Sequence, residues 1–554
     1  MIRNILFFIL FFSGFTKGIT QNVTRYIVTP PLSNITTIID GNSISGLIPG
    51  DTIAITGGKY YQLLIRNIKG TKIRPIIVIN RGIQVNVSGN TIYGVKIGGC
   101  NFLKFTGKGN NSDYYGIAIK DIITSLSTGG IGLSIDDLST NIEVENIEIK
   151  NVTYVGIMAK TDPSCLFSTQ YSSFVMRDLF IHDTYIHKIG HEGMYIGSSK
   201  FKDGYLLNCN GVNSTVYPHL LKNLKIYKNI VDSTGWDGVQ ISCADSAKVY
   251  NNKVTRDSQA DSLYQMSGIL IGSGSQNFEC YNNKIINGHG DAIEILGQGK
   301  IKVFNNLIVN PGQGISGTGQ SKHGVFVNTS ASTNPGWVYI LNNTIISPKT
   351  FGINFINAIS QSRASNNIII VPNPYLNALV YVQNPFLDNS YNLTKNTVTE
   401  SLNLFNDPAH DDYSLTFFSE AKDKGVDLSS YGITFDIMDN PRPYPASGNF
   451  DKGAYEYAPG VGIIDNENEV SDINIFPNPN NGQFKIKFSL VKPLLLSIKI
   501  YNIIGSCVFD SGIQLFNSNE NSFSINNTNF PKGLYLIKIQ SEELQRSFKM
   551  IVNK

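Results

Sequence analysis

The sequence predicts an all-β protein, in which a solenoid of stacked parallel strands is followed by a small antiparallel β-sandwich. The first observation is a phrase of apolar strand, Asn and second apolar strand that returns between Lys222 and Asn367. The second is a strict two-residue alternation in the strands that open with Gly. The third is a change of pattern after residue 472, where longer alternating strands lie between Gly and Pro turns.

The repeated phrase carries an Asn at one fixed position in every copy. Successive copies lie 23, 31, 23, 37 and 24 residues apart and contain Asn229, Asn252, Asn283, Asn306, Asn343 and Asn367. A repeat that keeps its strands and varies its loops is typical of a solenoid. At a bend, each Asn amide can bond the amides of the coils above and below. The sequence therefore predicts a structural Asn ladder, and the phrases around Asn146 and Asp183 are expected to begin it.

The strands that open with Gly alternate between two faces. In residues 238–242, Val239 and Ile241 share one face while Gln240 and Ser242 share the other. The same pattern in neighbouring coils places one residue per coil on the outward face: Met158, Tyr195, Gln240, Leu270, Glu294, Phe326 and Asn354. These coils are expected to stack as parallel strands about 4.8 Å apart.

These repeats resemble the right-handed parallel β-helix proteins, the superfamily of pectate lyases, polygalacturonases and chondroitinase B-type lyases. The resemblance covers residues 37–457, and residues 46–80 resemble the opening coils of chondroitinase B-like proteins. It implies a right-handed, single-stranded β-helix domain over residues 34–457, with substrate lying across the outer face of one sheet. Because the same fold also serves adhesins and phage tailspikes, it implies no single activity.

The N-terminus has the pattern of a secretory signal peptide. Arg3 precedes a short apolar run over residues 5–12, and small and polar residues follow, so residues 1–20 are assigned to the signal. No later segment is long enough to be a transmembrane helix, so none is expected. The formal net charge of +3 on 554 residues gives no support to a nucleic-acid partner. A monomeric protein is expected.

Six cysteines in an exported chain allow disulfides. Cys165, Cys209 and Cys243 follow the Gly-led strands of three successive coils, so two of the three can meet, while Cys280 fits a core position. Two long insertions, residues 160–174 and 198–221, leave the same edge of the Gly-led sheet. They are expected to form the wall of a cleft.

The C-terminal segment forms a separate unit. A Gly-, Asn- and acid-rich linker over residues 458–472 precedes three motifs in residues 473–554, INIFPNPNNGQFKIKF, IYNIIGSCVFD and FPKGLYLIKI. Their alternation predicts the antiparallel sandwich. In this order they closely resemble the C-terminal sorting domain of the Bacteroidetes type IX (Por) secretion system. The resemblance implies type IX machinery as a partner, passage across the outer membrane, and a secreted or surface-attached product.

Candidate site residues gather beside the Gly-led strands. The residue just before each of these strands adds a second column, which consists of Glu192, Asp237, Ser267, Asp291 and His323. These residues are expected beside the outward face. The predicted catalytic residues are Asp237, Asp291, Glu192, Glu294 and His289. The predicted substrate-binding residues are Trp236, Tyr195, Gln240 and Phe326. Sugars stack on aromatic faces and bind to acids and amides, so the sequence predicts a polysaccharide groove here.

The spacing of the acids decides which reactions are possible. Glu192 and Asp237 are one coil apart, about 5 Å, and Asp237 and Asp291 are two coils apart, about 10 Å. Retaining glycosidases need carboxyls about 5 Å apart and inverting ones roughly 6.5 to 9.5 Å apart, so either pair could serve. The Gly-His-Gly string at His289 resembles that of polygalacturonases, although their paired Asp-Asp and Arg-Ile-Lys motifs are missing.

A lyase remains an alternative reaction, slightly less favoured than a hydrolase. It requires a base, for which Lys160, Arg256 and the histidines are candidates, and a cation or Ca²⁺ held by the acids. No other cofactor and no CxxC metal motif is predicted. Acids before Gly are also ordinary turn residues. A noncatalytic glycan-binding, adhesive or structural surface protein is therefore the alternative function.

Overall fold

The computed structural model describes residues 24–109, 113–314, 321–329, 336–356, 361–371, 381–382, 388–395, 404–416, 418–458, 470–490, 493–503, 505–517, 519–526, 529–540 and 545–553. The predicted signal peptide and most of the predicted linker lie outside these residues. The chain divides into two compact units, Met1–Tyr457 and Ala458–Lys554. None of the described residues forms a helix long and apolar enough to cross a membrane.

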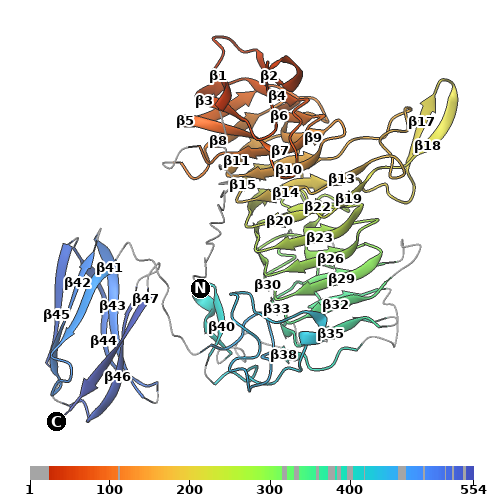
Figure 1. Cartoon of the computed structure of the whole chain (residues 1–554). Helices are drawn as coiled ribbons and strands as arrows, with labels where there is room; N and C mark the ends of the chain where they lie inside the picture. Colours follow the sequence, from red (N-terminus) through yellow and green to blue (C-terminus); the bar gives the residue numbers. More distant parts are fainter. Residues whose placement is uncertain are drawn as a thin grey trace, which may run out of the picture. The chain divides into compact units, whose positions relative to one another are not determined.

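Two long parallel sheets build the first unit, shown from red to cyan in Figure 1. The Gly-led strands form a 12-stranded sheet: β2 (Thr36–Asp40), β4 (Gln62–Arg66), β6 (Tyr93–Gly98), β9 (Ile131–Asp136), β12 (Ile157–Ala159), β16 (Met194–Ile196), β22 (Val239–Ile241), β25 (Ser267–Ile271), β28 (Asp291–Ile295), β31 (Val325–Val327), β34 (Ile353–Phe355) and β37 (Tyr381–Val382).

The other strands of the coils join in a sheet of 24: β1 (Thr24–Val28), β3 (Thr52–Tyr60), β5 (Ile76–Gly89), β7 (Asn101–Thr106), β8 (Ile117–Ile122), β10 (Thr140–Glu145), β11 (Ile147–Val152), β13 (Val175–Arg177), β14 (Phe180–His182), β15 (Tyr185–Ile189), β19 (Leu220–Lys222), β20 (Lys225–Tyr227), β21 (Ile230–Thr234), β23 (Ala244–Tyr250), β24 (Lys253–Thr255), β26 (Gln276–Tyr281), β27 (Lys284–Ile286), β29 (Gly299–Phe304), β30 (Leu307–Val309), β32 (Val338–Leu341), β33 (Thr344–Ile346), β35 (Arg363–Ser365), β36 (Ile368–Ile370) and β38 (Leu393–Lys395).

One coil contributes one strand to the smaller sheet and two to the larger. Strands β20, β21 and β22 of one coil pair in parallel with β23, β24 and β25 of the next. The inward side chains of all coils form one continuous core of Ile, Val and Leu, which includes Val239 and Ile241. The predicted right-handed parallel β-helix is therefore confirmed.

Shorter elements close the helix and extend from it. They are η1 (Gly41–Ser43), the hairpin β17 (Tyr205–Cys209) and β18 (Val212–Val216), the hairpin β39 (Phe405–Asp407) and β40 (Asp412–Leu415), η3 (Pro408–His410) and η4 (Ser429–Tyr431). The segment after β38 covers the last coils. Its Phe435 packs against Tyr281 and Phe304, and its buried Arg442 bonds Asn305 and Glu456.

The Asn ladder is present. The amide of Asn283 donates to Asn306 Oδ1 at 3.0 Å, and its own Oδ1 accepts the amide and backbone N–H of Asn252, each at 3.0 Å. The same bonds link all six predicted residues and continue to Asn392, which the sequence reading missed. The predicted beginning at Asn146 is wrong, because the strand register aligns Asn146 and Asp183 with Lys228, one residue before the ladder position.

Replacing Asn283 with Ala should lower the free energy of unfolding of the β-helix by about 1 to 3 kcal/mol. The substitution leaves the Asn252 donors, Val249 C=O and Asn306 Oδ1 without their partner inside the core. Thermal melting measures the effect. Asn282→Gly is the matched control, because Asn282 has a φ of +53° and no hydrogen bond to its side chain. Equal melting temperatures for Asn283→Ala and wild type would contradict a role of the ladder in stability.

Antiparallel strands form the second unit. One sheet contains β41 (Val470–Phe476), β42 (Gln483–Leu490) and β45 (Asn519–Asn526), and the other contains β43 (Leu494–Asn502), β44 (Cys507–Phe516), β46 (Gly533–Gln540) and β47 (Gln545–Val552). Alternate residues of both sheets, such as Ile486, Ile498 and Ile537, form one separate apolar core. The sandwich predicted from the alternation of these strands is confirmed.

Candidate functional site

A column of polar residues lies at the entry of the 12-stranded sheet. Backbone hydrogen bonds stack Glu192 on Asp237, Asp237 on Ser267, and Asp291 on His323 in successive coils. In the two preceding coils the same position holds Ile131 and Val155, which are core residues. Acids therefore replace apolar residues at one position of the fold over a limited number of coils. Burying a carboxyl costs free energy that an apolar residue would not, so stability alone does not explain these residues.

The acids of this column lie beside the outward column, but they are buried rather than exposed. Asp237 is 0% exposed, and Glu192 and Asp291 are each 4% exposed. The position after each acid faces the core, because a Cβ on Gly238 would lie 2.6 Å from Val254 and Ala292 at the same position packs in the core. The acids themselves lie next to the outward column, where Ser267 of their column bonds Glu294. Both carboxylate oxygens of Asp237 and Oε2 of Glu192 have no hydrogen-bond partner among the described residues.

Burial raises the pKa of each of these three acids. The pKa of Glu192 rises to about 7, because the charged form is removed from water. Burial, together with the nearby charges of Glu294 and Glu192, raises the pKa of Asp237 well above its usual value. Burial raises the pKa of Asp291 to about 7 despite Lys322, whose Nζ lies 3.0 Å from Oδ2. Carboxyls that hold a proton near neutral pH can act as general acids.

The outward column is only partly accessible. The strand pairings stack Met158, Tyr195, Gln240, Leu270, Glu294, Phe326 and Asn354 in the predicted order. Gln240 and Leu270 are buried, while Tyr195, Glu294 and Phe326 are half-buried. Glu294 accepts a 2.5 Å hydrogen bond from Ser267 Oγ and so joins the two columns. Burial raises the pKa of Glu294 as well.

Aromatic and histidine side chains line the bend before the acids. The Trp236 ring stacks on His191 at 3.7 Å between centroids, and Tyr154 meets the edge of His191 at 4.6 Å. His289 lies further along the same bend, and its Nδ1 is 3.0 Å from Oδ1 of Asp261. Trp236, His191 and His289 are all half-buried, so they border the acid column rather than fill it.

Three charged residues of this region were missed by sequence reasoning. Asp257 points into the core at the position that holds Val152 and Ile189 in earlier coils, and a Cβ on Gly288 would lie 1.9 Å from its Oδ2. Asp261 and Lys322 lie on long connections that carry no repeat. An alignment of the strands that follow each Asn of the repeated phrase would have revealed Asp257. In that alignment, Asp257 takes the position that Val152 and Ile189 hold in earlier coils.

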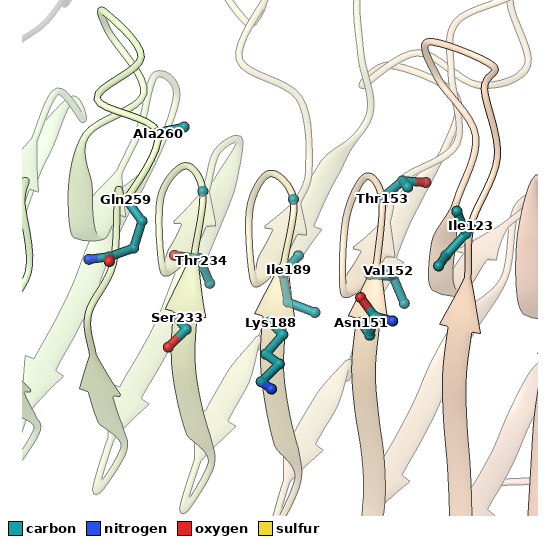
Figure 2. Close-up of a pocket in the computed structure, with 12 residues that line it drawn as sticks. Ile123, Asn151, Val152, Thr153, Lys188, Ile189, Ser233, Thr234, Gln259 and Ala260 are labelled. Atoms are coloured by element: carbon teal, nitrogen blue, oxygen red, sulfur yellow. The ribbon is translucent and has the colours of Figure 1, made fainter.

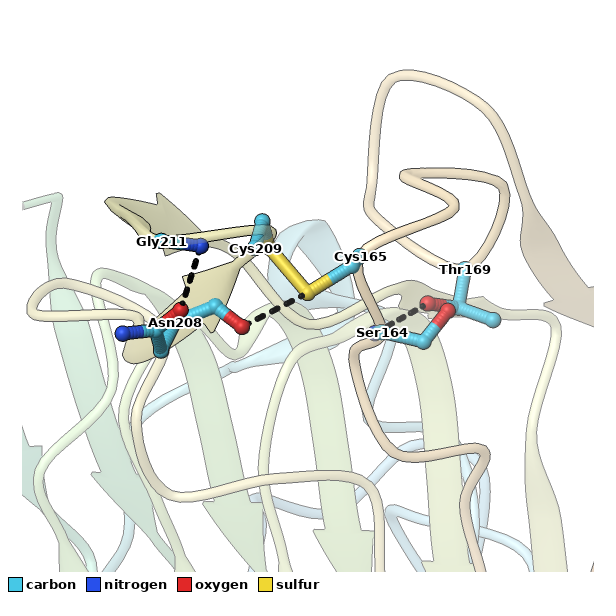
Figure 3. The surroundings of a disulfide bond; sticks show 6 residues. All are labelled: Ser164, Cys165, Thr169, Asn208, Cys209 and Gly211. Atoms are coloured by element: carbon cyan, nitrogen blue, oxygen red, sulfur yellow. Dashed lines mark hydrogen bonds between the residues drawn. A yellow bond between two sulfur atoms is a disulfide. The ribbon is translucent and has the colours of Figure 1, made fainter.

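The two insertions are joined beside the 12-stranded sheet. A disulfide links Cys165 to Cys209 with Cα atoms 5.4 Å apart (Figure 3), so one of the predicted pairings is present. Cys243 and Cys280 are buried free thiols. Next to the first insertion, Lys160 Nζ bonds Asp162 at 2.7 Å and lies 5.3 Å from the Tyr195 ring centroid. This places the insertions at the edge of the outward column.

The acids of the column do not form a cation site of the kind considered for Ca²⁺. Among the described residues, three ligand atoms from His, Cys, Asp or Glu come within 4.8 Å of one another only at Glu143, Glu145 and His182, on the larger sheet. There Lys104 Nζ lies 2.6 Å from Glu143 and 2.9 Å from Glu145 and occupies the space of an ion. No step of the chemistry below requires a metal.

Comparison with known proteins identifies the second unit. The family model described as "Secretion system C-terminal sorting domain" matches residues 474–553. No curated protein sequence matches the chain.

Several solved structures are similar to the chain. A complex of XylC with xylose is 10% identical, covers 76% of this chain and 98% of its own, and has a TM-score of 0.43. The PL6 family alginate lyase AlyGC is 14% identical, with coverages of 65% and 51% and a TM-score of 0.38. The enzymatically active domain of bacteriophage CBA120 tailspike protein 2 is 11% identical, with coverages of 96% and 71% and a TM-score of 0.30. The chain is thus a right-handed parallel β-helix protein whose C-terminal sorting domain directs it by type IX secretion to the cell surface or outside.

Proposed function

We propose that the β-helix domain binds a polysaccharide across the 12-stranded sheet and cleaves it by acid–base chemistry. The observation that carries this proposal is the replacement of core residues by Glu192, Asp237 and Asp291 in one column. Protonated Asp237 or Glu192 supplies the acid for the leaving oxygen, and Glu294 or Asp291, in the fraction of molecules where it has lost its proton, acts on water or on the sugar. Lys322 beside Asp291 favours that ionised form. Tyr195, Gln240, Phe326 and Trp236 hold the glycan, and His289 assists proton transfer.

We favour a glycoside hydrolase over a lyase. The stacked acids lie one coil and two coils apart, about 5 Å and about 10 Å at the backbone, which is close to the carboxyl separations that retaining and inverting hydrolases use. A lyase must neutralise a uronate carboxylate, and Lys322 is held by Asp291 while Lys160 is held by Asp162.

A polysaccharide panel tests the proposed function. The secreted protein is incubated with neutral and acidic polysaccharides, and products are followed by reducing ends and by ultraviolet absorbance. A hydrolase yields new reducing ends without absorbance, while a lyase yields an absorbing double bond. No product from any polysaccharide, together with measurable glycan binding, would instead identify the second candidate, a noncatalytic glycan-binding protein. The burial of Asp237 favours that second candidate, because substrate must reach a carboxyl that is 0% exposed.

A further inference from the structure

A recess of about 610 Å³ lies over the bend that leads from the larger sheet to the 12-stranded sheet. It crosses the ends of β11, β15 and β21, where short connections, residues 153–156, 190–193 and 235–238, follow the strands. Longer connections bound it on both sides, residues 123–130 and 256–266. Figure 2 shows these tall loops, which carry Ile123 and Ala260, on either side of the low turns. Loop length alone therefore creates a groove that spans three coils.

Backbone packing fixes the depth of this groove. A Cβ on Gly190 would lie 2.2 Å from the carbonyl oxygen of Thr153, and a Cβ on Gly235 would lie 1.9 Å from that of Gly190. Neither position has room for a side chain, so no side chain of Gly190 or Gly235 projects into the groove from these turns. Since coils are about 4.8 Å apart, the floor is roughly 10 to 15 Å long, which suits a short oligosaccharide.

Half of the residues that line the groove have hydrogen-bonding side chains, and the others are apolar residues and glycines. The hydrogen-bonding side chains are those of Asn151, Thr153, Lys188, Ser233, Thr234 and Gln259. None of the acids of the candidate site lines it. Lys188 is exposed and has no ion-pair partner in the part of the chain that the structure describes, whereas nearby Arg256 is bonded to Asp232. The amide of Asn151 already donates to Asp121, and the hydroxyls of Thr153 and Thr234 already bond backbone carbonyls. The groove therefore offers a ligand mainly the Ser233 hydroxyl and the Gln259 amide beside the unneutralised ammonium of Lys188.

This combination fits one class of ligand. Hydroxyl and amide groups pair with sugar hydroxyls, and an ammonium group bonds a carboxylate more strongly than a neutral acceptor. We propose that this groove binds a short acidic oligosaccharide, with Lys188 bonded to the carboxylate of a uronate residue. The site is separate from the proposed catalytic column and acts as an additional glycan-binding site.

Calorimetric titration with defined trisaccharides tests this site. The probes are trimers of galacturonate, mannuronate and glucuronate, with a neutral galactose trimer as the comparison. We expect at least one uronate trimer to bind, the neutral trimer to bind at least about tenfold more weakly, and Lys188→Gln to lose about tenfold in affinity. Lys228→Gln is the matched control, because Lys228 is also exposed at a bend with a φ of +54°, against +55° for Lys188. It should bind like wild type.

A second variant separates this groove from the proposed function. Asp237→Asn should keep the uronate affinity, whether or not the acid column proves to be catalytic. Affinity lost in Asp237→Asn and kept in Lys188→Gln would place the uronate in the acid column and overturn the proposal. Failure of all three uronate trimers to bind would also overturn it, as would equal binding of the neutral trimer. Binding of an acidic hexapeptide in place of the uronates would point to a protein partner and would overturn it too.

Discussion

Substitution of Asp237 by Asn should reduce turnover of the substrate polysaccharide by at least about a hundredfold while the protein still folds. Asn keeps the size of the side chain but can neither donate an acidic proton nor serve as a base or nucleophile. Asp237 is fully buried without hydrogen-bond partners, so the uncharged amide should not weaken the fold through loss of a bond. Steady-state rates on a polysaccharide that the panel identifies, together with thermal melting, measure the two effects.

The pH dependence of the reaction gives a second readout of the same site. Burial raises the pKa of Glu192 and of Asp291 to about 7, above their ordinary values near 4.5 and 3.8. Between those values and pH 7 the folded protein retains protons that the unfolded chain has released. The free energy of unfolding should therefore fall as pH rises through this window, and general-acid activity should fall as pH rises above about 7. Glu192→Gln should flatten the stability curve.

Asp291→Asn should behave like Asp237→Asn if the two acids act as a pair. A noncatalytic glycan-binding protein would respond differently, with affinity lowered by Trp236→Ala and unchanged by Asp237→Asn. Turnover that survives both Asp substitutions would rule out the carboxylate mechanism. The histidines of the bend and Lys160 would then be the next residues to replace.

Deletion of residues 473–554 should abolish delivery to the surface and the medium in a host with type IX secretion. The sorting-domain match occupies residues 474–553, and this unit has its own apolar core. The β-helix has a separate core, so the truncated protein should fold and accumulate in the periplasm. Cell fractionation with immunodetection measures its location.

A reciprocal fusion is the control for the truncation. An unrelated periplasmic reporter that carries residues 458–554 should reach the surface or the medium in the same host. The same fusion in a strain without type IX secretion should stay in the periplasm. Normal export of the truncated chain would contradict the role of this unit as the sorting signal.

The Asn phrases and the Gly-led strands determined the fold and most of its register. A repeat of about 23 residues with a two-residue alternation predicts a coil of three short strands. The parallel pairings of β22 with β25 and of β25 with β28 agree with this prediction. The repeated phrase alone did not determine which of its residues forms the ladder. Asn146 has the right residue type and the wrong register, because a shift of one residue at a bend changes the direction of the side chain.

The sequence by itself determined the β-helix, the sorting domain and which residues stack in successive coils, because those features depend on local periodicity. Only the tertiary structure decided how deeply the acids are buried. Asp237 lies just before Gly238, at a bend where the alternation of the strand does not determine the exposure of the side chain, and the packing around it decides its burial. Tertiary structure also chose Cys209 as the partner of Cys165 and brought Asp257, Asp261 and Lys322 beside the column. These contacts join segments whose separation depends on loop length, which has no period for a sequence to reveal.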